Sequence, residues 1–437
     1  MNDFPDLSLQ DLAARLARRE VSAETVTRAS IARIEEMEPA VHAWQHFEPA
    51  QAIAQARRLD AQTPGGALHG VPIGVKDLMD TADMPTTYGS PIYAGHQPQM
   101  DASCVAASRS AGAVIMGKTV TTEFATFHPG ATSNPHRTHK ADGTPQLHTP
   151  GGSSSGSAAA VACGMVPVAF GTQTAGSIVR PAAYCGVVGY KPTFGMLPLA
   201  GIKPLSPSLD TVGVLARSVG DAAFFISTLS HLPLSPLPAA APARLRLGIC
   251  RTPHWDRASQ ATRTVLERAA SLLEASGARL SDVSVPDACK GLNEAQMTIM
   301  GFEAALAFAP ESQASPTGFS KAFEKFIAAG SAVDGAAYFA AQELAATARC
   351  AVTGIFNEVD ILLAPSTEGE APAGLEATGD PVFNRMWTLL GNPCVHVPLG
   401  TGAGGMPIGV TLIGPRWGDA QTLAAADLLE RSFAKKQ

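Results

Sequence analysis

Charged and aromatic residues are scarce in this sequence of 437 residues, at 16% and 6% of the total. The formal net charge of −6 argues against bulk binding to nucleic acid and against binding to anionic membrane surfaces. No apolar run reaches the ~18–20 residues that span a bilayer. The first six residues contain neither the basic nor the apolar stretch typical of a signal peptide. We therefore expect a cytoplasmic protein that binds neither nucleic acid nor membrane.

Metal-binding patterns are also missing. The cysteines are odd in number and contain no CxxC pair, which predicts buried free thiols in a reducing compartment. The histidines lack metal-ligand spacing, and His136, His139 and His148 lie in a stretch that we expect to be a solvated loop. The sequence thus predicts no metal site. The seven cysteines are Cys104, Cys163, Cys185, Cys250, Cys289, Cys350 and Cys394.

Hydrophobic residues make up 46% of the chain, enough to fill a large core. Short apolar runs typical of buried strands alternate with helical segments, which favours an α/β layer fold. Strands are expected on both sides of the Pro- and Ala-rich connector Leu232–Ala243, so this connector does not separate two cores. The expected strands are Val71–Val75, Ala113–Met116, Val166–Phe170, Val187–Tyr190, Leu245–Cys250, Asp360–Ala364, Cys394–Pro398 and Gly409–Ile413. The expected helices include one capped by Ser8, then Glu24–Met37, Pro49–Asp60, Thr262–Ser276, Leu292–Phe308, Lys321–Phe356 and one from Asp419.

Two common motifs match the residue pattern of this sequence, but the surrounding residues do not fit the structures that these motifs need. Residues 112–119 fit the phosphate-binding pattern GxxxxGK[ST], but their branched apolar residues favour a buried strand that ends at Gly117. Residues 152–156 fit the GxSxG elbow of α/β-hydrolases, which needs a later catalytic histidine. Of the three later histidines, His396 lies in an expected strand interior. A flexible linker over residues 151–157 is disfavoured, because the apolar run that follows is typical of a buried helix.

One lysine and two serine clusters carry the chemistry of the chain. They lie in residues 74–77 (GVKD), 151–157 (GGSSSGS) and 171–178 (GTQTAGSI). A serine hydroxyl needs a base to become a nucleophile, and a lysine can be that base when burial lowers its pKa. The three segments can therefore supply a nucleophile, a proton relay and a base without histidine. This combination points to amide-bond hydrolysis.

At this point the sequence resembles the amidase signature family of serine hydrolases. The resemblance extends from about residue 8 to the end, although residues 220–355 are not diagnostic. It implies a single large α/β domain with a mixed central sheet that is covered by helices on both faces. The matching blocks are residues 70–77, 111–119, 123–125, 151–193, 208–213, 216–219, 391–393 and 407–410. Within 1–437 we expect an N-terminal helical segment (1–65), a signature core (66–220), a variable helical part (221–355) and a C-terminal return to the core (356–437).

By this resemblance Ser177 is the nucleophile, Ser153 the bridging serine and Lys76 the base, with no cofactor. The separation of the two serines is the one that the family keeps. The resemblance also implies a cis peptide bond between Gly152 and Ser153. A charged Asp77 beside the base would oppose the lowering of its pKa, so we expect Asp77 to point away or to bind backbone.

The remaining site residues follow from the turn and from the resemblance. Backbone N–H groups of the turn Thr174, Ala175, Gly176 and Ser177 can form an oxyanion hole. Ser154, Ser155 and Arg180 are expected to support the site by hydrogen bonds. The candidate walls of the substrate pocket are Met79, Tyr88, Phe124, Phe127, Met386 and Trp387. An apolar wall would favour aryl or alkyl amides. Cleavage of esters or carbamates is a reaction closely related to amide cleavage.

Three departures from the family pattern leave the substrate open. Gln173 and Ala175 stand where the commonest signature has Asp and Gly, and Arg180 comes one position later than usual. The family also includes the A subunit of tRNA-dependent amidotransferases, which acts with partner chains, and a catalytically silent scaffold is the third alternative. For an amidohydrolase we expect a small-molecule amide substrate, and a homodimer is left open.

Overall fold

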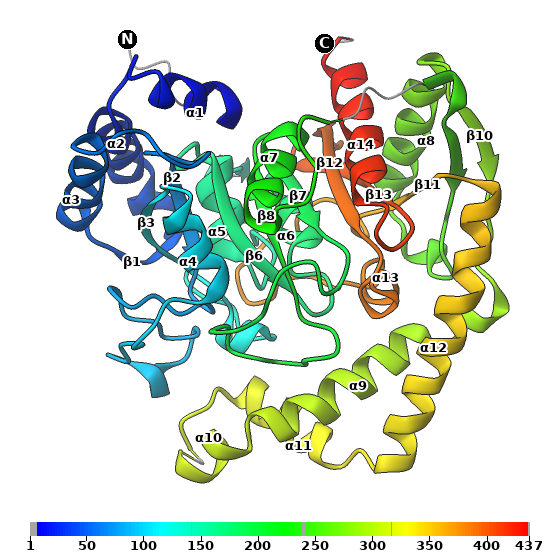
Figure 1. The fold of residues 1–437 in the computed structure, drawn as a ribbon. Helices are drawn as coiled ribbons and strands as arrows, with labels where there is room; N and C mark the ends of the chain where they lie inside the picture. The colour runs from blue at the N-terminus through cyan, green and yellow to red at the C-terminus, as the bar shows by residue number, and fades with distance from the viewer. Residues whose placement is uncertain (1–6, 141, 238–241, 316, 436–437) are drawn as a thin grey trace.

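The computed structural model describes residues 7–140, 142–237, 242–315 and 317–435 (Figure 1). Its centre is one eleven-stranded sheet in the order β1-β3-β2-β6-β8-β7-β12-β13-β11-β9-β10. A separate two-stranded hairpin pairs β4 (Thr138–His139) with β5 (Pro145–Gln146). The strands of the large sheet are β1 (Trp44–Phe47), β2 (Pro72–Lys76), β3 (Val114–Thr119), β6 (Val168–Gln173), β7 (Val188–Lys191), β8 (Thr211–Ala216), β9 (Arg246–Ile249), β10 (Arg279–Asp282), β11 (Ile361–Pro365), β12 (Cys394–Thr401) and β13 (Pro407–Ile413).

The sheet is mixed, as predicted. β2 lies between β3 and β6 and runs parallel to both, whereas β8 is antiparallel to β6 and β7. The strands from residues 44–216 are joined to β11, β9 and β10 through the antiparallel pair β12 and β13. All residues of β2, β3, β6 and β8 are buried, which explains their nearly continuous apolar character.

Helices cover both faces of the sheet (Figure 1). α5 packs against α6. α14 packs against both α7 and α8, and these three helices lie on β8, β12 and β13. The helices are α1 (Leu9–Ala17), α2 (Ala23–Val41), α3 (Pro49–Asp60), α4 (Ser103–Ser110), α5 (Ser155–Ala162), α6 (Val179–Cys185), α7 (Val219–Ser230), α8 (Gln260–Ala275), α9 (Leu292–Ala307), α10 (Ala309–Ala314), α11 (Lys321–Ser331), α12 (Gly335–Glu358), α13 (Arg385–Leu390) and α14 (Asp419–Ala434). Within the described ranges, no helix is both long and apolar enough to cross a bilayer.

The first half of the predicted variable helical part (221–355) supplies β9 and β10 to the central sheet and α8 beside it, whereas α9 to α12 form a separate helical layer. In Figure 1, helices α9 to α12 gather on the side of the molecule away from both termini. α9 packs against α11, α12 and α13, so it connects this layer to the C-terminal part of the core. The layer therefore reaches the site through α9 and α13.

The predicted strands are all present, and the differences have physical causes. β3 continues through Lys118 to Thr119, because the lysine is buried and paired rather than exposed at a strand end. The single helix predicted over Lys321–Phe356 is wrong: α11 ends at Ser331, and Asp334 caps α12 by accepting the N–H of Ala337 at 2.7 Å. β1, β8 and β10 were not predicted. Part of the predicted connector, residues 238–241, lies outside the described residues.

Two side-chain expectations need correction. All seven cysteines are free, but Cys350 on α12 is exposed, whereas the other six are buried as expected. His148 is also buried rather than solvated, with Nδ1 2.8 Å from the carbonyl oxygen of Ala371. Among the described residues, no group of three or more His, Cys, Asp or Glu side chains could hold a metal ion.

Candidate active site

Lys76 is the last residue of β2 and is fully buried. Its Nζ lies 2.8 Å from Ser153 Oγ and 2.7 Å from Thr172 Oγ1. β2 and β6 run parallel, so the carboxyl ends of both strands meet at the same edge of the sheet, where Lys76 and Thr172 face each other. The sheet thus places Lys76 beside Thr172, and the segment just before α5 (Ser155–Ala162) brings the predicted bridging serine to the same amine.

Burial determines the charge state of this amine. Desolvation lowers the pKa of Lys76 well below 10.5, and the buried carboxylate of Asp210 acts in the opposite direction. Burial also raises the pKa of Asp210 to about 6, although the Thr174 hydroxyl donates to its carboxylate at 2.5 Å. The net effect favours the neutral amine, which is the form that can accept a proton.

Asp77 points away from this centre, which confirms the expectation for it. Consecutive residues of a strand project to opposite faces. The Asp77 carboxylate lies 3.1 Å from Lys118 Nζ and accepts both the N–H and the hydroxyl of Thr87. Lys118 Nζ also donates to the hydroxyl of Thr86 at 2.5 Å. The negative charge next to Lys76 is therefore neutralised on the other side of the strand.

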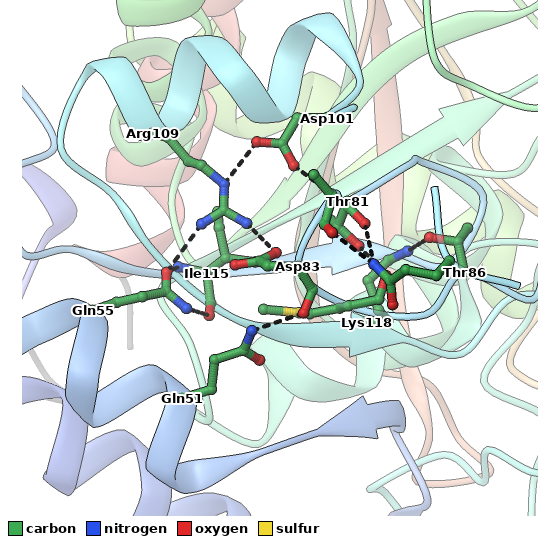
Figure 2. A network of polar contacts seen from close by, with 12 residues as sticks. Gln51, Gln55, Thr81, Asp83, Thr86, Asp101, Arg109, Ile115 and Lys118 are labelled. Atoms are coloured by element: carbon green, nitrogen blue, oxygen red, sulfur yellow. Dashed lines mark hydrogen bonds and ion pairs between the residues drawn. The ribbon is translucent and has the colours of Figure 1, made fainter. Parts of the chain in front are cut away.

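The loop that follows Lys76 is fixed by a second set of polar contacts (Figure 2). Arg109 on α4 lies 2.5 Å from Asp83 and 2.9 Å from Asp101, and it also donates to Gln55 at 3.2 Å. Gln55 on α3 donates in turn to the carbonyl of Ile115 in β3. These contacts attach the loop to the strand next to β2.

Ser153 follows a cis peptide bond to Gly152, as the resemblance implied. The guanidinium of Arg180 donates to the carbonyl of Gly152 at 2.7 Å through Nη2 and at 3.2 Å through Nε. Ser154 Oγ lies 3.3 Å from both the N–H and the carbonyl of Thr172, and Ser155 Oγ donates to Val120 O at 3.3 Å. Each of the three residues expected to support the site contacts backbone next to it.

The turn from Thr174 to Ser177 is held by its carbonyl groups. Gln296 donates to Thr174 O at 2.9 Å, Thr388 donates to Ala175 O at 2.7 Å, and the N–H of residue 180 donates to Gly176 O at 2.9 Å. In a planar trans peptide the N–H points opposite to the carbonyl. Fixing these three carbonyls therefore fixes the directions of the N–H groups of residues 175–177.

Gln173 uses both ends of its side-chain amide within the site. Its Oε1 accepts the N–H groups of Ile178 and Val179 at 2.9 and 3.1 Å, at the start of α6. Its Nε2 donates to Thr388 Oγ1 at 2.9 Å, a contact that a carboxylate could not make as a donor. This departure from the family pattern is thus accommodated within the site.

Ser177 opens onto a small recess. At its rim Gly176 approaches the segment before α13 so closely that an added Cβ would lie 2.6 Å from Pro381 Cβ. Phe124 and Ala125 adopt the left-handed backbone region (φ 47° and 60°) where the chain turns towards the recess. Its lining consists of Ala125, Thr126, Phe127, Thr174, Ala175, Ser177, Arg180, Leu205, Met300, Pro381 and Arg385.

Only one of the six predicted pocket walls, Phe127, lines this recess. The other five are buried in the core, because an apolar pattern marks a residue as buried and does not say which buried surface borders a cavity. Phe124, for example, stacks in a cluster with Phe308 and Phe323 at centroid distances of 4.7 and 4.9 Å. The five core residues are Met79, Tyr88, Phe124, Met386 and Trp387. Two arginines in the lining also contradict the expected apolar wall.

A family model described as Amidase matches residues 25–423. The chain belongs to this amidase family. Amide hydrolysis is the chemistry of the family. Among curated relatives, the chain is 33% identical to the A subunit of the glutamyl-tRNA(Gln) amidotransferase of Acidothermus cellulolyticus, over the whole chain and 96% of the relative. It is 32% identical to the protein of the same description from Oleidesulfovibrio alaskensis, over 98% of the chain and 97% of the relative.

Solved structures agree with this family assignment. The amidase fold superposes on a crystal structure described as an amidase with a TM-score of 0.86, at 29% identity over 97% of this chain and 99% of the other. The native peptide amidase of Stenotrophomonas maltophilia matches with a TM-score of 0.78, at 28% identity over 97% and 96% of the two chains. Fatty acid amide hydrolase, at 22% identity and a TM-score of 0.87, shares the fold.

Several residues at the site of this amidase were missed by the sequence analysis. Thr172 and Asp210 lie within blocks that carry the family resemblance, and their place in those blocks could have marked them as site residues. Gln296, Arg385 and Thr388 come from α9 and α13, and no motif marks them. They reach the site only through the packing of α9 against α13.

Proposed function

We propose that this protein is a serine amidohydrolase that cleaves a C–N amide bond of a small molecule through an acyl-enzyme on Ser177. The observation that carries the proposal is the fully buried amine of Lys76 at 2.8 Å from Ser153 Oγ, with its pKa lowered by burial. A neutral amine in contact with a serine hydroxyl is a base placed to accept its proton.

The reaction begins with a proton relay. Neutral Lys76 takes the proton of Ser153, which takes that of Ser177, and Ser177 Oγ attacks the carbonyl carbon. The oxyanion receives hydrogen bonds from backbone N–H groups of Thr174, Ala175, Gly176 and Ser177, and the fixed carbonyls of this turn support that role for residues 175–177. The C–N bond then breaks as the proton returns along the relay to the leaving nitrogen. Water hydrolyses the acyl ester and restores Ser177.

Active-site labelling tests the nucleophile. A fluorophosphonate probe is expected to label wild-type protein and not Ser177→Ala, and Ser177→Ala and Lys76→Ala should each remove nearly all amidase activity. Ser331→Ala is a matched control, because this hydroxyl donates within its own helix to Ile327 O on the exposed side of α11. Either site variant that retained more than about a tenth of the wild-type rate would refute the assignment.

A panel of anilides, primary aliphatic amides, esters and carbamates tests the bond that is cleaved. We expect turnover of amides, and slower turnover of esters and carbamates. Turnover of esters alone would refute an amidohydrolase.

The second candidate is an A subunit of an amidotransferase. It is favoured by the description of the curated relatives, which are 31–33% identical over almost their entire length. Gln173 and Ala175 depart from the pattern of that branch. Copurification with partner chains and glutamine-dependent transamidation would support it, whereas amide hydrolysis by the isolated chain, as a monomer or a homodimer, would support the amidohydrolase.

A further inference from the structure

Two guanidinium groups line the recess beside Ser177. Arg180 and Arg385 are 5% and 8% exposed, and they come from different parts of the chain, on α6 and α13. The rest of the lining is apolar or carries hydroxyl groups. The recess is therefore a small space with positive charge in its wall.

Among the described residues, no carboxylate is in direct contact with the Arg180 guanidinium. Its side chain donates to the carbonyls of Gly152 and Gly379 rather than to a carboxylate. Burial lowers the pKa of Arg180 to about 10, which leaves the group protonated at neutral pH. Asp380 acts on Arg180 through its charge and Arg385 acts against it, so an anion in the recess would add a direct partner for this buried cation.

Arg385 is only weakly paired. Its Nη1 donates to Gln296 Oε1 at 2.9 Å, and its Nη2 lies 3.9 Å from Asp380 Oδ1, too far for a hydrogen bond. Asp380 is also shared with Arg257 at 3.6 Å and is well exposed, and Glu294 is a further acid that acts on Arg385 through its charge. The planar guanidinium matches the geometry of a carboxylate, which it can bind through two parallel N–H bonds.

We propose that the substrate of this amidase carries a carboxylate within a few bonds of the scissile amide, and that Arg385 binds this carboxylate while Arg180 adds positive charge. The inference rests on the proposed function and names the substrate class for it. Leu205, Met300 and Phe127 would contact the short apolar chain between the carboxylate and the amide. The chemical class is a half-amide of a short dicarboxylic acid, or an amide whose amine portion is an amino acid.

Matched substrate pairs test this proposal and separate the two sources of the carboxylate. Succinamate is compared with butyramide for a carboxylate on the acyl side, and N-acetyl-β-alanine with N-propylacetamide for one on the amine side. Wild-type enzyme is expected to prefer the carboxylate member of one pair by at least about tenfold in kcat/KM. In Arg385→Gln this preference should disappear through a higher KM for the carboxylate member, whose loss in kcat/KM should exceed any loss for the neutral member by at least about tenfold. Arg257→Gln is the matched control, since this arginine also pairs with Asp380 and does not line the recess.

A binding measurement tests the proposal even where the enzyme turns over these substrates slowly. The carboxylate member should slow fluorophosphonate labelling of Ser177 in wild type and much less so in Arg385→Gln, with each protein compared with its own labelling rate without ligand. Equal protection by charged and neutral members in wild type, or equal losses for both in Arg385→Gln, would overturn the proposal. Failure of labelling in wild type would instead overturn the proposed function.

Discussion

The hydroxyl of Thr388 lies 2.7 Å from the carbonyl oxygen of Ala175, two residues before the proposed nucleophile. The same hydroxyl accepts a hydrogen bond from Gln173 Nε2 at 2.9 Å. Thr388 is on α13, so this contact attaches the C-terminal return of the chain to the turn that carries Ser177. The orientation of the proposed oxyanion donors therefore depends on a side chain that does not contact the substrate recess.

Thr388→Val should lower kcat by about tenfold and change KM little, because misplaced backbone donors weaken binding of the transition state more than that of the substrate. Steady-state kinetics on one amide substrate measures both parameters. Thr353→Val on the exposed side of α12, where the hydroxyl donates to Arg349 O, is the control and should behave as wild type. An unchanged kcat in Thr388→Val would show that the turn holds its shape without this contact.

Lys76→Met should abolish activity and raise the free energy of unfolding at pH 7 by ~0.5–2 kcal/mol, because a buried amine is replaced by an apolar side chain of similar length. The pKa of Lys76 is lowered in the folded state, so the unfolded chain binds this proton more tightly. Wild-type stability should therefore rise with pH up to about 10.4, the pKa in the unfolded chain, and Lys76→Met should lack that contribution. Urea denaturation at several pH values measures it, and a variant less stable than wild type at pH 7 would contradict the argument.

Asp210→Asn should move the acid limb of the kcat/KM profile to lower pH. The Asp210 carboxylate stabilises protonated Lys76, so removing its charge lowers the pKa of the base further. The effect should shrink below about pH 6, where Asp210 itself becomes protonated in wild type. Asp221→Asn is the control, because it is another buried aspartate, bonded to the N–H of Leu9 away from the site. A limb that stayed in place or moved to higher pH would argue against Lys76 as the titrating base.

Lys118→Met should destabilise the protein by ~3–5 kcal/mol, because it leaves the buried Asp77 carboxylate without its cation. The double variant Asp77→Asn with Lys118→Met should lose less than this single change, since no uncompensated charge then remains. Denaturant unfolding of the single and double variants gives the comparison. A loss below about 1 kcal/mol in Lys118→Met would mean that Thr87 alone satisfies the carboxylate.

The sequence was informative where burial and local pattern decide the structure. β2, β3 and β6 each begin as an apolar run, and the need for a neutral Lys76 predicted that Asp77 points away from it. β10 was missed because its four residues, Arg279–Asp282, are mostly exposed and show no apolar period.

The walls of the recess could not be predicted for a different reason. Met300 and Arg385 border Ser177 only because α9 and α13 pack against each other, far along the chain from the signature. Neither residue belongs to a local pattern. Such contacts depend on tertiary packing, which hydrophobic periodicity does not encode.

The central position of β12 and β13 has a consequence for biosynthesis. This hairpin leaves the ribosome after both halves of the sheet that it joins. Until it emerges, β7 and β11 each present an open edge to which a neighbouring nascent chain could add a strand. We expect the yield of native enzyme in cells to depend on chaperones that shield these edges during translation.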